Sequence, residues 1–294
     1  NGGRRPTRTM SKPMPEGDTI FRTARSLHRA LAGHRATQFD TAYAHLARVD
    51  DDGPIAGRMI ERCEAAGKHV LIVFEGDLIL RTHMRMSGSW HLYRHGERWW
   101  RGPQAKRVRV GTEAWVSVAF DVPVAEFVTA RQLASTDPVA ALGPDLLKPG
   151  FDRDEAVRRI RAAGALPIAQ ALLAQRLVAG IGNVYKSEVL FLSGVHPDTP
   201  ASAVPLDAIE RILDIARSLL SDNVVEGTPA AIQTYRSLRR TDRRSDPSDS
   251  LWVYSRAGRP CRKCGTPIEA KKMGLDARST YWCCTCQPAI GGGS

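Results

Sequence analysis

Apolar residues recur at helical spacing close to the start of the chain. The positions with this spacing are Ile20, Phe21, Ala24, Leu27 and Leu31. Residues three and four apart share one face of a helix, so the spacing predicts a helix over residues 19–31 whose apolar stripe faces a core. Gly33 is a typical residue just beyond a helix C-terminus, and Asp18 is a candidate N-cap.

Between about residues 35 and 130 the apolar pattern changes to short β-like runs. These runs cover residues 70–74, 78–80, 89–93, 107–110 and 115–120. Glu75-Gly76-Asp77, between the first two runs, is a signal for a tight hairpin. Several short strands separated by turns predict a β-sandwich.

The helical period returns in the second half of the chain. Residues 136–150 carry Pro and Gly and are expected to form a linker. Beyond it the pattern predicts helices over residues 154–163, 167–178, 183–192 and 206–220. Gly180 and Gly182 separate the second of these from the third. The whole pattern is typical of an α+β protein with more than one domain.

The composition and net charge of the chain limit the classes of function that it can have. The chain has 294 residues, 43% of them hydrophobic, which is enough for one large core or two smaller ones. The formal net charge is +11, and because four of the positive charges precede Pro15, +7 remains on the rest of the chain. This excess favours a polyanionic partner, either nucleic acid or an acidic membrane face. No apolar run reaches the ~18 residues of a membrane span, and the start lacks a signal-peptide core, so we expect a soluble intracellular protein.

A basic run within residues 222–250 has two interpretations. Its arginines are Arg236, Arg239, Arg240, Arg243 and Arg244. A run of this kind is either a solvated loop or a contact for DNA, and the sequence leaves both interpretations open.

Cysteine spacing near the C-terminus predicts a metal site. Cys261 and Cys264 form one C-x-x-C pair, and Cys283 and Cys286 form a second. Two such pairs are typical of a structural zinc site with four thiolates, and a disulfide framework is disfavoured because nothing indicates secretion. Cys284 could replace Cys283, but the spacing selects Cys283. A closed four-thiolate site has no open position for water, so the single Zn²⁺ is expected to hold the fold.

The other two cysteines are expected to be spare thiols. Cys284 would lie beside the metal site, and Cys63 would be a small apolar core residue.

The residues Met14-Pro15-Glu16-Gly17 also have two interpretations. If Met14 is the true initiator, its removal leaves Pro15 as a free secondary amine, which can attack an electrophilic carbon. In the other interpretation Pro15 only fixes φ ahead of the helix. With residues 1–14 attached, Pro15 is a tertiary amide with no lone pair for attack. We expect an overextended start, with Met14 as the initiator.

Four separated motifs resemble one family. They are residues 14–17 (Met-Pro-Glu-Gly), residues 67–69 with 83–90 (Gly-Lys-His and His-Met-Arg-Met-Ser-Gly-Ser-Trp), residues 178–183 (Val-Ala-Gly-Ile-Gly-Asn) and residues 278–283 (Arg-Ser-Thr-Tyr-Trp-Cys). Over about residues 14–287 the chain resembles the formamidopyrimidine-DNA glycosylase and endonuclease VIII superfamily of base-excision repair enzymes. Residues 142–145 (Leu-Gly-Pro-Asp) are similar to the family as well.

The resemblance implies a fold and a set of domains. The family fold is an N-terminal helix and β-sandwich, then a helical domain with a helix–two-turn–helix, then a zinc-finger hairpin, with DNA between them. The expected divisions are 1–14 for an extension without fixed structure, 15–135 for the catalytic domain, 136–150 for the linker, 151–225 for the helix–two-turn–helix domain, 226–250 for a basic loop, 251–288 for the zinc finger and 289–294 for a flexible tail.

The resemblance also implies the chemistry. The expected activity is that of a bifunctional DNA glycosylase and abasic-site lyase. Pro15 would attack C1′ of a flipped nucleotide and form an iminium, and β- and δ-eliminations would then cleave the strand. Glu16 would be the general acid, which needs a pKa near neutrality. In the alternative interpretation, Glu16 is an ordinary carboxylate at the start of a helix, where the helix dipole favours negative charge.

The remaining site residues implied by the resemblance bind DNA. Lys68 would hold a phosphate next to the lesion, and Arg278 would clamp the flanking phosphates bidentately. The glycines around Ile181 would allow backbone amides and Asn183 to approach a phosphate, and Asn183 could at the same time be a helix N-cap. Met86, beside Arg85, would fill the hole left by the flipped base, or be a core residue. His83 is either a phosphate donor or a core histidine.

Two departures from the family bear on the substrate. Residues 120–127 lack the Arg-Arg-Phe-Gly element of the formamidopyrimidine branch, which favours the endonuclease VIII branch and oxidised pyrimidines. Thr19 stands where the family usually has a glutamate.

The expected partner is double-stranded DNA with a damaged or abasic nucleotide, bound by a monomer in the bacterial cytoplasm. The alternatives are a non-catalytic damaged-DNA-binding protein and an RNA-binding zinc-ribbon protein, which would leave Pro15 and Glu16 unexplained.

Overall fold

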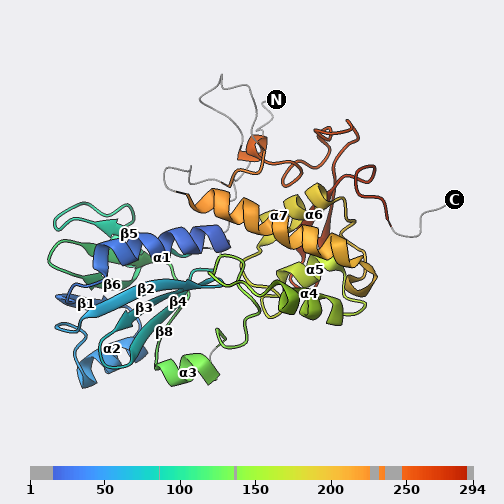
Figure 1. The fold of residues 1–294 in the computed structure, drawn as a ribbon. Helices are drawn as coiled ribbons and strands as arrows, with labels where there is room; N and C mark the ends of the chain where they lie inside the picture. Colours follow the sequence, from blue (N-terminus) through green and yellow to red (C-terminus); the bar gives the residue numbers. More distant parts are fainter. Residues whose placement is uncertain (1–15, 86, 136–137, 226–231, 236–246, 290–294) are drawn as a thin grey trace, which may run out of the picture.

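The computed structural model describes residues 16–85, 87–135, 138–225, 232–235 and 247–289, which fold into two halves side by side (Figure 1). The chain enters through helix α1 (Gly17–Leu31), which lies along the N-terminal half and reaches the second half at its first turn. The predicted helix is therefore confirmed. Its stop is confirmed too, because Ala32 is the C-cap and Gly33 follows with a φ of 79°.

Asp18 does not cap α1, so that interpretation is wrong. The N-cap is Glu16, whose side chain makes no capping bond to α1. Asp18 lies inside the first turn, is fully buried, and pairs with Arg22 one turn later.

Two four-stranded antiparallel sheets form the N-terminal half. In one sheet the strand order is β1-β6-β7-β5, and in the other it is β2-β3-β4-β8. The strands are β1 (Gln38–Thr41), β2 (Ile60–Ala66), β3 (His69–Phe74), β4 (Leu78–His83), β5 (Ser89–Tyr93), β6 (Lys106–Gly111), β7 (Val116–Phe120) and β8 (Val124–Val128). One apolar core joins residues of both sheets and of α1, as the β-sandwich prediction requires.

The predicted β3–β4 hairpin is present and its turn chemistry explains it. Gly76 and Asp77 both have positive φ, 87° and 56°, as a two-residue turn of the type favoured in hairpins requires. Helices α2 (Ala44–Asp52) and α3 (Ala130–Ser135) also belong to this half. Neither they nor β1, β2 and β8 were expected from the sequence.

Within the described residues, four helices build the second half. They are α4 (Arg153–Ala162), α5 (Ile168–Leu173), α6 (Asn183–Ser193) and α7 (Leu206–Val224). The helix expected over 167–178 is wrong beyond Leu173, because the chain turns at Ala174 and the Gln175 side chain binds the backbone of Leu173, Gly180 and Ile181. Short 3-10 turns occur at Pro103–Ala105, Ala201–Ala203 and Pro247–Ser250.

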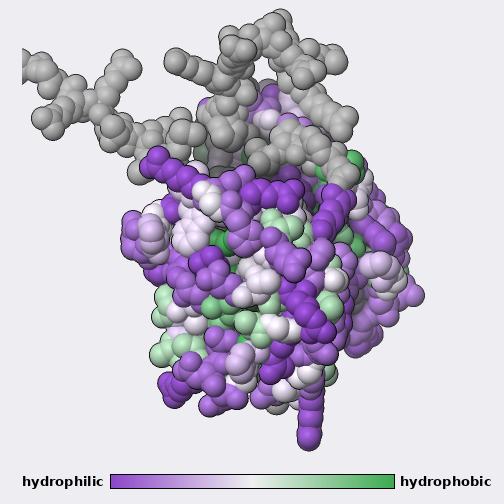
Figure 2. All heavy atoms as spheres, turned by 90° about the vertical axis from the view of Figure 1, so that its left-hand side faces the viewer, coloured by the Kyte–Doolittle hydropathy of each residue, from purple (hydrophilic) through white to green (hydrophobic). Residues whose placement is uncertain are grey.

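A two-stranded hairpin follows, formed by β9 (Glu269–Met273) and β10 (Arg278–Trp282). It packs on α6. Among the described residues, no helix combines the length and apolarity that crossing a membrane requires. Figure 2 shows that the end face of the N-terminal half is mostly hydrophilic, with apolar residues surfacing in small patches.

Residues 138–150 fix the two halves to one another. Leu146 is fully buried, and the Asp145 carboxylate accepts a hydrogen bond from the Gly67 amide at 2.9 Å. The Gly143 amide donates to the Gln175 carbonyl at 2.8 Å. The segment expected to be a linker therefore holds the turn before β3 against the helical half.

Candidate active site and metal centre

Glu16 is the centre of the candidate active site. Its carboxylate reaches across to the N-terminus of α6, where Oε1 accepts a hydrogen bond from the Val184 amide at 2.7 Å and Oε2 accepts one from the Tyr185 amide at 3.2 Å. The first amides of a helix have no partner within the helix and carry partial positive charge, so they bind a carboxylate well. Glu16 is only 1% exposed.

Glycines make this approach possible. A Cβ on Gly182 would lie 2.2 Å from Cδ of Glu16, and one on Gly17 would lie 2.5 Å from the Gly180 carbonyl oxygen. The Gly17 amide donates to that same oxygen at 3.2 Å. Gly180 has a φ of 109°, whereas Gly182 has a φ of −113° and so is needed for space alone. The sequence suggested that these glycines bring amides to a phosphate, but the Val184 and Tyr185 amides hold Glu16.

Replacing Gly182 by Ala is expected to displace the Glu16 side chain. The added Cβ overlaps the carboxyl group, and overpacking of this kind costs about 1–3 kcal/mol of folding free energy. We expect a lower melting temperature and loss of the Glu16-dependent activity. Gly53→Ala is the matched control, since its Cβ would meet only the flexible end of Arg58 at 3.2 Å. If both variants melt and react alike, the packing argument is wrong.

Burial changes the pKa of the Glu16 carboxyl group. Desolvation raises its pKa from the ordinary 4.5 to about 7, against the lowering effect of the Val184 amide and the Lys68 charge. A carboxyl group with this pKa is partly protonated at neutral pH, as the general-acid hypothesis requires. Asp18, in the first turn of α1, has a raised pKa for the same reason.

Lys68 adds positive charge beside this carboxyl group, and Arg278 adds positive charge beside Lys68. Lys68 is half-buried in the turn before β3, where burial lowers its pKa and the Glu16 charge raises it. Arg278 begins β10, is half-buried, and its charge lowers the pKa of Lys68. Elements from both halves thus meet at Glu16, and the hairpin contributes a charge close to Lys68.

Asn183 is the first residue of α6, and its neighbours fix the orientation of its amide. The N-cap is Gly182, so the N-cap interpretation of Asn183 is wrong. Oδ1 accepts a hydrogen bond from Lys186 Nζ at 2.6 Å, and Nδ2 donates to the Tyr254 hydroxyl at 3.4 Å. Because a lysine can only donate, the amide NH₂ must face away from Lys186.

Lys186 is a functional-site neighbour that the sequence prediction missed. It is 1% exposed, and Nζ also donates to the Ser279 carbonyl at 3.0 Å and the Thr280 hydroxyl at 2.8 Å, which ties α6 to β10. Burial lowers its pKa to about 7, and the Arg278 charge acts in the same direction. The available signal was a lysine within a helix that also carries several apolar residues.

Glu188 was missed as well. Its carboxylate accepts hydrogen bonds from the amides of Trp252, Val253 and Tyr254 at 2.8, 2.9 and 2.8 Å. It therefore fixes the segment that carries the chain from the helical half toward the hairpin.

His83 and Arg85 lie at the end of β4. The His83 ring packs edge-on against His69, with ring centroids 4.7 Å apart, and Nδ1 accepts a hydrogen bond from the Arg85 amide at 3.1 Å. Burial and then the Lys68 charge lower the pKa of His83. Arg85 is exposed with a φ of 44°.

The structure does not describe three of the predicted features. They are Pro15, Met86 and the arginines at 236–244, and residues 1–14 and 290–294 also lie outside the described residues.

The four predicted cysteines form one cluster. The sulfur atoms of Cys261, Cys264, Cys283 and Cys286 all lie within 4.8 Å of one another, so they could hold a metal ion. Individual Sγ–Sγ distances are 3.4 Å for Cys264–Cys283 and 3.9 Å for Cys261–Cys286. A tetrahedron with zinc–sulfur bonds of 2.3 Å has edges of about 3.8 Å, so the donor set fits zinc.

The two spare thiols are also where the spacing predicted them. Cys284 is exposed and outside the cluster, and Cys63 is buried in the core of the N-terminal half.

Comparison with known proteins agrees with this arrangement. The family described as the formamidopyrimidine-DNA glycosylase N-terminal domain matches residues 14–137, and the one described as the formamidopyrimidine-DNA glycosylase H2TH domain matches residues 142–234. A crystal structure of Lactococcus lactis formamidopyrimidine-DNA glycosylase, bound non-covalently to DNA with an abasic site, has the same fold. It has a TM-score of 0.76 at 21% identity and covers 94% of this chain and 100% of that one.

Two curated relatives are closer in sequence. A probable endonuclease 8 2 of Streptomyces coelicolor is 40% identical over 93% of this chain and 94% of its own length. A DNA-(apurinic or apyrimidinic site) lyase Nei2 of Mycolicibacterium smegmatis is 36% identical over 94% of this chain and all of its own. With both domain families matched in order around Glu16 and the cysteine cluster, the chain belongs to the formamidopyrimidine-DNA glycosylase and endonuclease VIII superfamily, in its endonuclease VIII branch.

Proposed function

We propose that this protein is a DNA glycosylase and abasic-site lyase of base-excision repair that acts on oxidised bases, pyrimidines above all. The observation that carries the proposal is Glu16, a buried carboxyl group with a pKa of about 7 directly after Pro15 in the sequence. The names of the two curated relatives and the net charge of +11 support the same activity.

The substrate is double-stranded DNA with a damaged or abasic nucleotide. A base inside a duplex is out of reach, so the nucleotide must leave the stack, at a cost of a few kcal/mol that is smaller for a poorly stacked lesion. Lys68, Asn183 and Arg278 would bind backbone phosphates around it, with the Asn183 NH₂ directed away from Lys186. Arg85 and Met86, in the loop between β4 and β5, would fill the gap in the stack.

The reaction begins at the Pro15 nitrogen. It forms a bond to C1′ while the bond from C1′ to the base breaks, and the base leaves with a proton. Two protons are needed, one for the departing base and one for the sugar ring oxygen; Glu16 supplies one, and the Pro15 amine, which loses its N–H proton on bonding to C1′, supplies the other. The bond from C1′ to the ring oxygen then opens to give an iminium on Pro15. Loss of a C2′ proton expels the 3′ phosphate, and a second elimination expels the 5′ phosphate.

The cysteine cluster would hold one zinc ion with a structural role. Four thiolates leave no open position on the ion, so its contribution is to fix the hairpin. Arg278 lies on that hairpin, and Lys186 bonds to the two residues after it. The metal would thus keep Arg278 near Lys68 and Lys186. The monomeric state and the cytoplasmic location stay predictions.

Strand cleavage separates this proposal from its rival. Protein that begins at Pro15 is expected to cut a duplex containing thymine glycol and to leave phosphate at both ends of the gap. A non-catalytic damage-binding protein of the same fold would bind this duplex in a salt-sensitive way without cutting it. Tight binding with no cleavage by any preparation that begins at Pro15 would therefore refute the enzyme proposal.

A further inference from the structure

A tryptophan-bearing loop lies on the outer face of the N-terminal half. Residues 94–105, which we call the Trp strap, connect β5 to β6 and fold back along the sheet β1-β6-β7-β5. Near its middle the Trp100 amide donates to the Tyr93 hydroxyl at 3.0 Å. At its end the Ala105 carbonyl accepts from the Asp121 amide at 2.8 Å. The strap therefore leaves the C-terminal end of β5 at Tyr93 and runs back along the sheet. It finishes at the opposite end, where Ser89 begins β5 and Phe120 ends β7.

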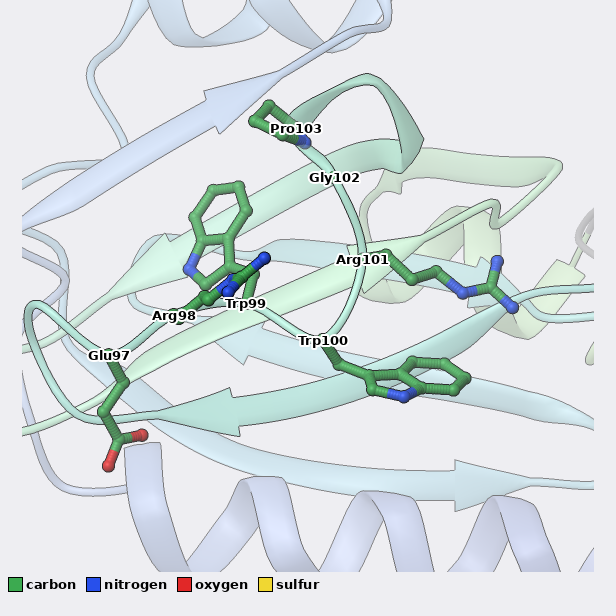
Figure 3. Close-up of a pocket in the computed structure, with 7 residues that line it drawn as sticks. All are labelled: Glu97, Arg98, Trp99, Trp100, Arg101, Gly102 and Pro103. Carbon is green, nitrogen blue, oxygen red and sulfur yellow. The ribbon is translucent and has the colours of Figure 1, made fainter.

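The two tryptophans of the strap have different roles. Trp99 is half-buried, and its ring lies 5.9 Å from that of Phe120, so it covers the apolar outer face of the sheet. Trp100 is 61% exposed. Its ring lies 5.1 Å from His91, and the Arg101 guanidinium lies 4.9 Å from the ring centroid. Figure 3 shows Trp100 and Arg101 extending to the same side of the loop, away from Trp99.

Asp121 joins the strap to the loop between β4 and β5. The Asp121 carboxylate pairs with Arg101, and its carbonyl accepts a hydrogen bond from the Ser87 hydroxyl at 3.2 Å. That loop begins after His83, which packs on His69 next to Lys68. Asp121 thus links Arg101 to the loop between β4 and β5. In the proposed function, this loop fills the gap that the flipped nucleotide leaves in the base stack.

The strap has the chemistry of a site for single-stranded nucleic acid. Its residues 97–103 line a hollow of about 640 Å³ that contains Arg98, Arg101 and the exposed Trp100 ring (Figure 3). Glu97, in the same hollow, accepts a hydrogen bond from the Arg94 amide at 2.8 Å. Nucleobases stack on aromatic side chains, and nearby arginines bind the phosphates. Trp99 covers the apolar face of the sheet, whereas Trp100 packs against His91 and still leaves 61% of its surface exposed.

We propose that Trp100 is a stacking platform for a nucleobase that has lost its pairing partner beside the lesion, with the exposed Arg98 as a cation for the adjoining backbone, while Arg101 stays paired with Asp121. The inference rests on the proposed function, since it places the unpaired base next to the loop between β4 and β5. It adds a DNA contact on the sheet β1-β6-β7-β5 to those around Glu16.

Two substitutions at one position test the stacking. Trp100→Leu keeps apolar bulk but removes the aromatic face, and Trp100→Phe keeps both. The probe is a duplex with a tetrahydrofuran abasic analogue. We expect Trp100→Leu to raise the Kd for this duplex about tenfold, which lies within the range that base–aromatic stacking contributes. Trp100→Phe should bind the duplex with nearly the wild-type Kd. Both variants should keep the wild-type melting temperature, because the side chain is largely exposed. Leu206→Ala, at an exposed apolar position of α7, is the surface control.

The outcomes separate this inference from the proposed function. Borohydride trapping of abasic DNA at saturating protein should still succeed for Trp100→Leu, because the variant keeps Glu16 and its surroundings. If trapping succeeds and Trp100→Leu binds the abasic duplex as tightly as wild type, the stacking proposal is overturned. An equal loss of affinity for intact, fully paired duplex would also overturn it, since no unpaired base is then involved. If wild-type protein that begins at Pro15 gives no adduct, the proposed function itself fails.

Discussion

Replacing Glu16 by Gln is expected to slow excision of a damaged base by about 10²–10⁴-fold, the range that a positioned general acid contributes. Gln has nearly the same shape and can still accept a hydrogen bond from an α6 amide, but it carries no transferable proton. Single-turnover release of thymine glycol from a duplex measures the effect. The variant should still bind abasic DNA, since Glu16 faces the amides of Val184 and Tyr185.

The pH dependence identifies Glu16 as the group responsible. Its pKa of about 7 means that the acid form is abundant below pH 7 and is lost above it, so the excision rate should fall as pH rises through 7. Because the folded protein holds this proton more tightly than the unfolded chain, the contribution of Glu16 to stability should also decrease between pH ~4.5 and ~7. In Glu16→Gln both dependences should disappear. A variant that keeps the wild-type rate and pH profile would contradict the general-acid role.

Removing the metal is expected to abolish DNA binding and cleavage together. Structural zinc contributes an apparent ~10–16 kcal/mol to small zinc-binding folds, and the apolar cluster around the cysteines is small and includes Phe191 of α6. Without the ion, β10 and Arg278 would lose their position against α6. Chelation or Cys261→Ser should therefore raise Kd for abasic DNA at least a hundredfold, as fluorescence anisotropy would measure.

Cys284→Ser is the matched control for this experiment. Cys284 is exposed, adjoins a ligand in sequence and lies outside the cluster, so the variant should keep one metal ion per chain and full activity. Metal-free protein with wild-type affinity would show that the hairpin does not depend on the ion.

The parts of the fold that the sequence predicts well are those where local chemistry and tertiary packing agree. Helix α1 has an unbroken apolar stripe, and the β3–β4 turn has Gly76 and Asp77 at the positions of positive φ. The C-x-x-C pairs select the four clustered cysteines by spacing alone. The helix and the turn each carry their signal in one short segment, and the cysteine signal lies in two short segments of fixed spacing.

The parts that were missed depend on residues far apart in the chain. Strand β2 has exposed charged residues and a register shift between Ile60 and Arg62, so it shows no regular alternation. Helix α5 ends early because Gln175 binds backbone across the following turn. Lys186 is polar in the sequence, but its three acceptors lie in α6 and in β10. Neither the space at Gly182 nor the burial of Glu16 follows from a local pattern.

The central claim is that the amine of Pro15 is the nucleophile. Borohydride reduction of the reaction with abasic duplex DNA tests it most directly, using protein that begins at Pro15 and protein that still carries residues 1–14. We predict a covalent protein–DNA adduct, mapped to Pro15 by mass spectrometry, only for the first preparation. No adduct with a free Pro15, or an equal yield when residues 1–14 are attached, would contradict it.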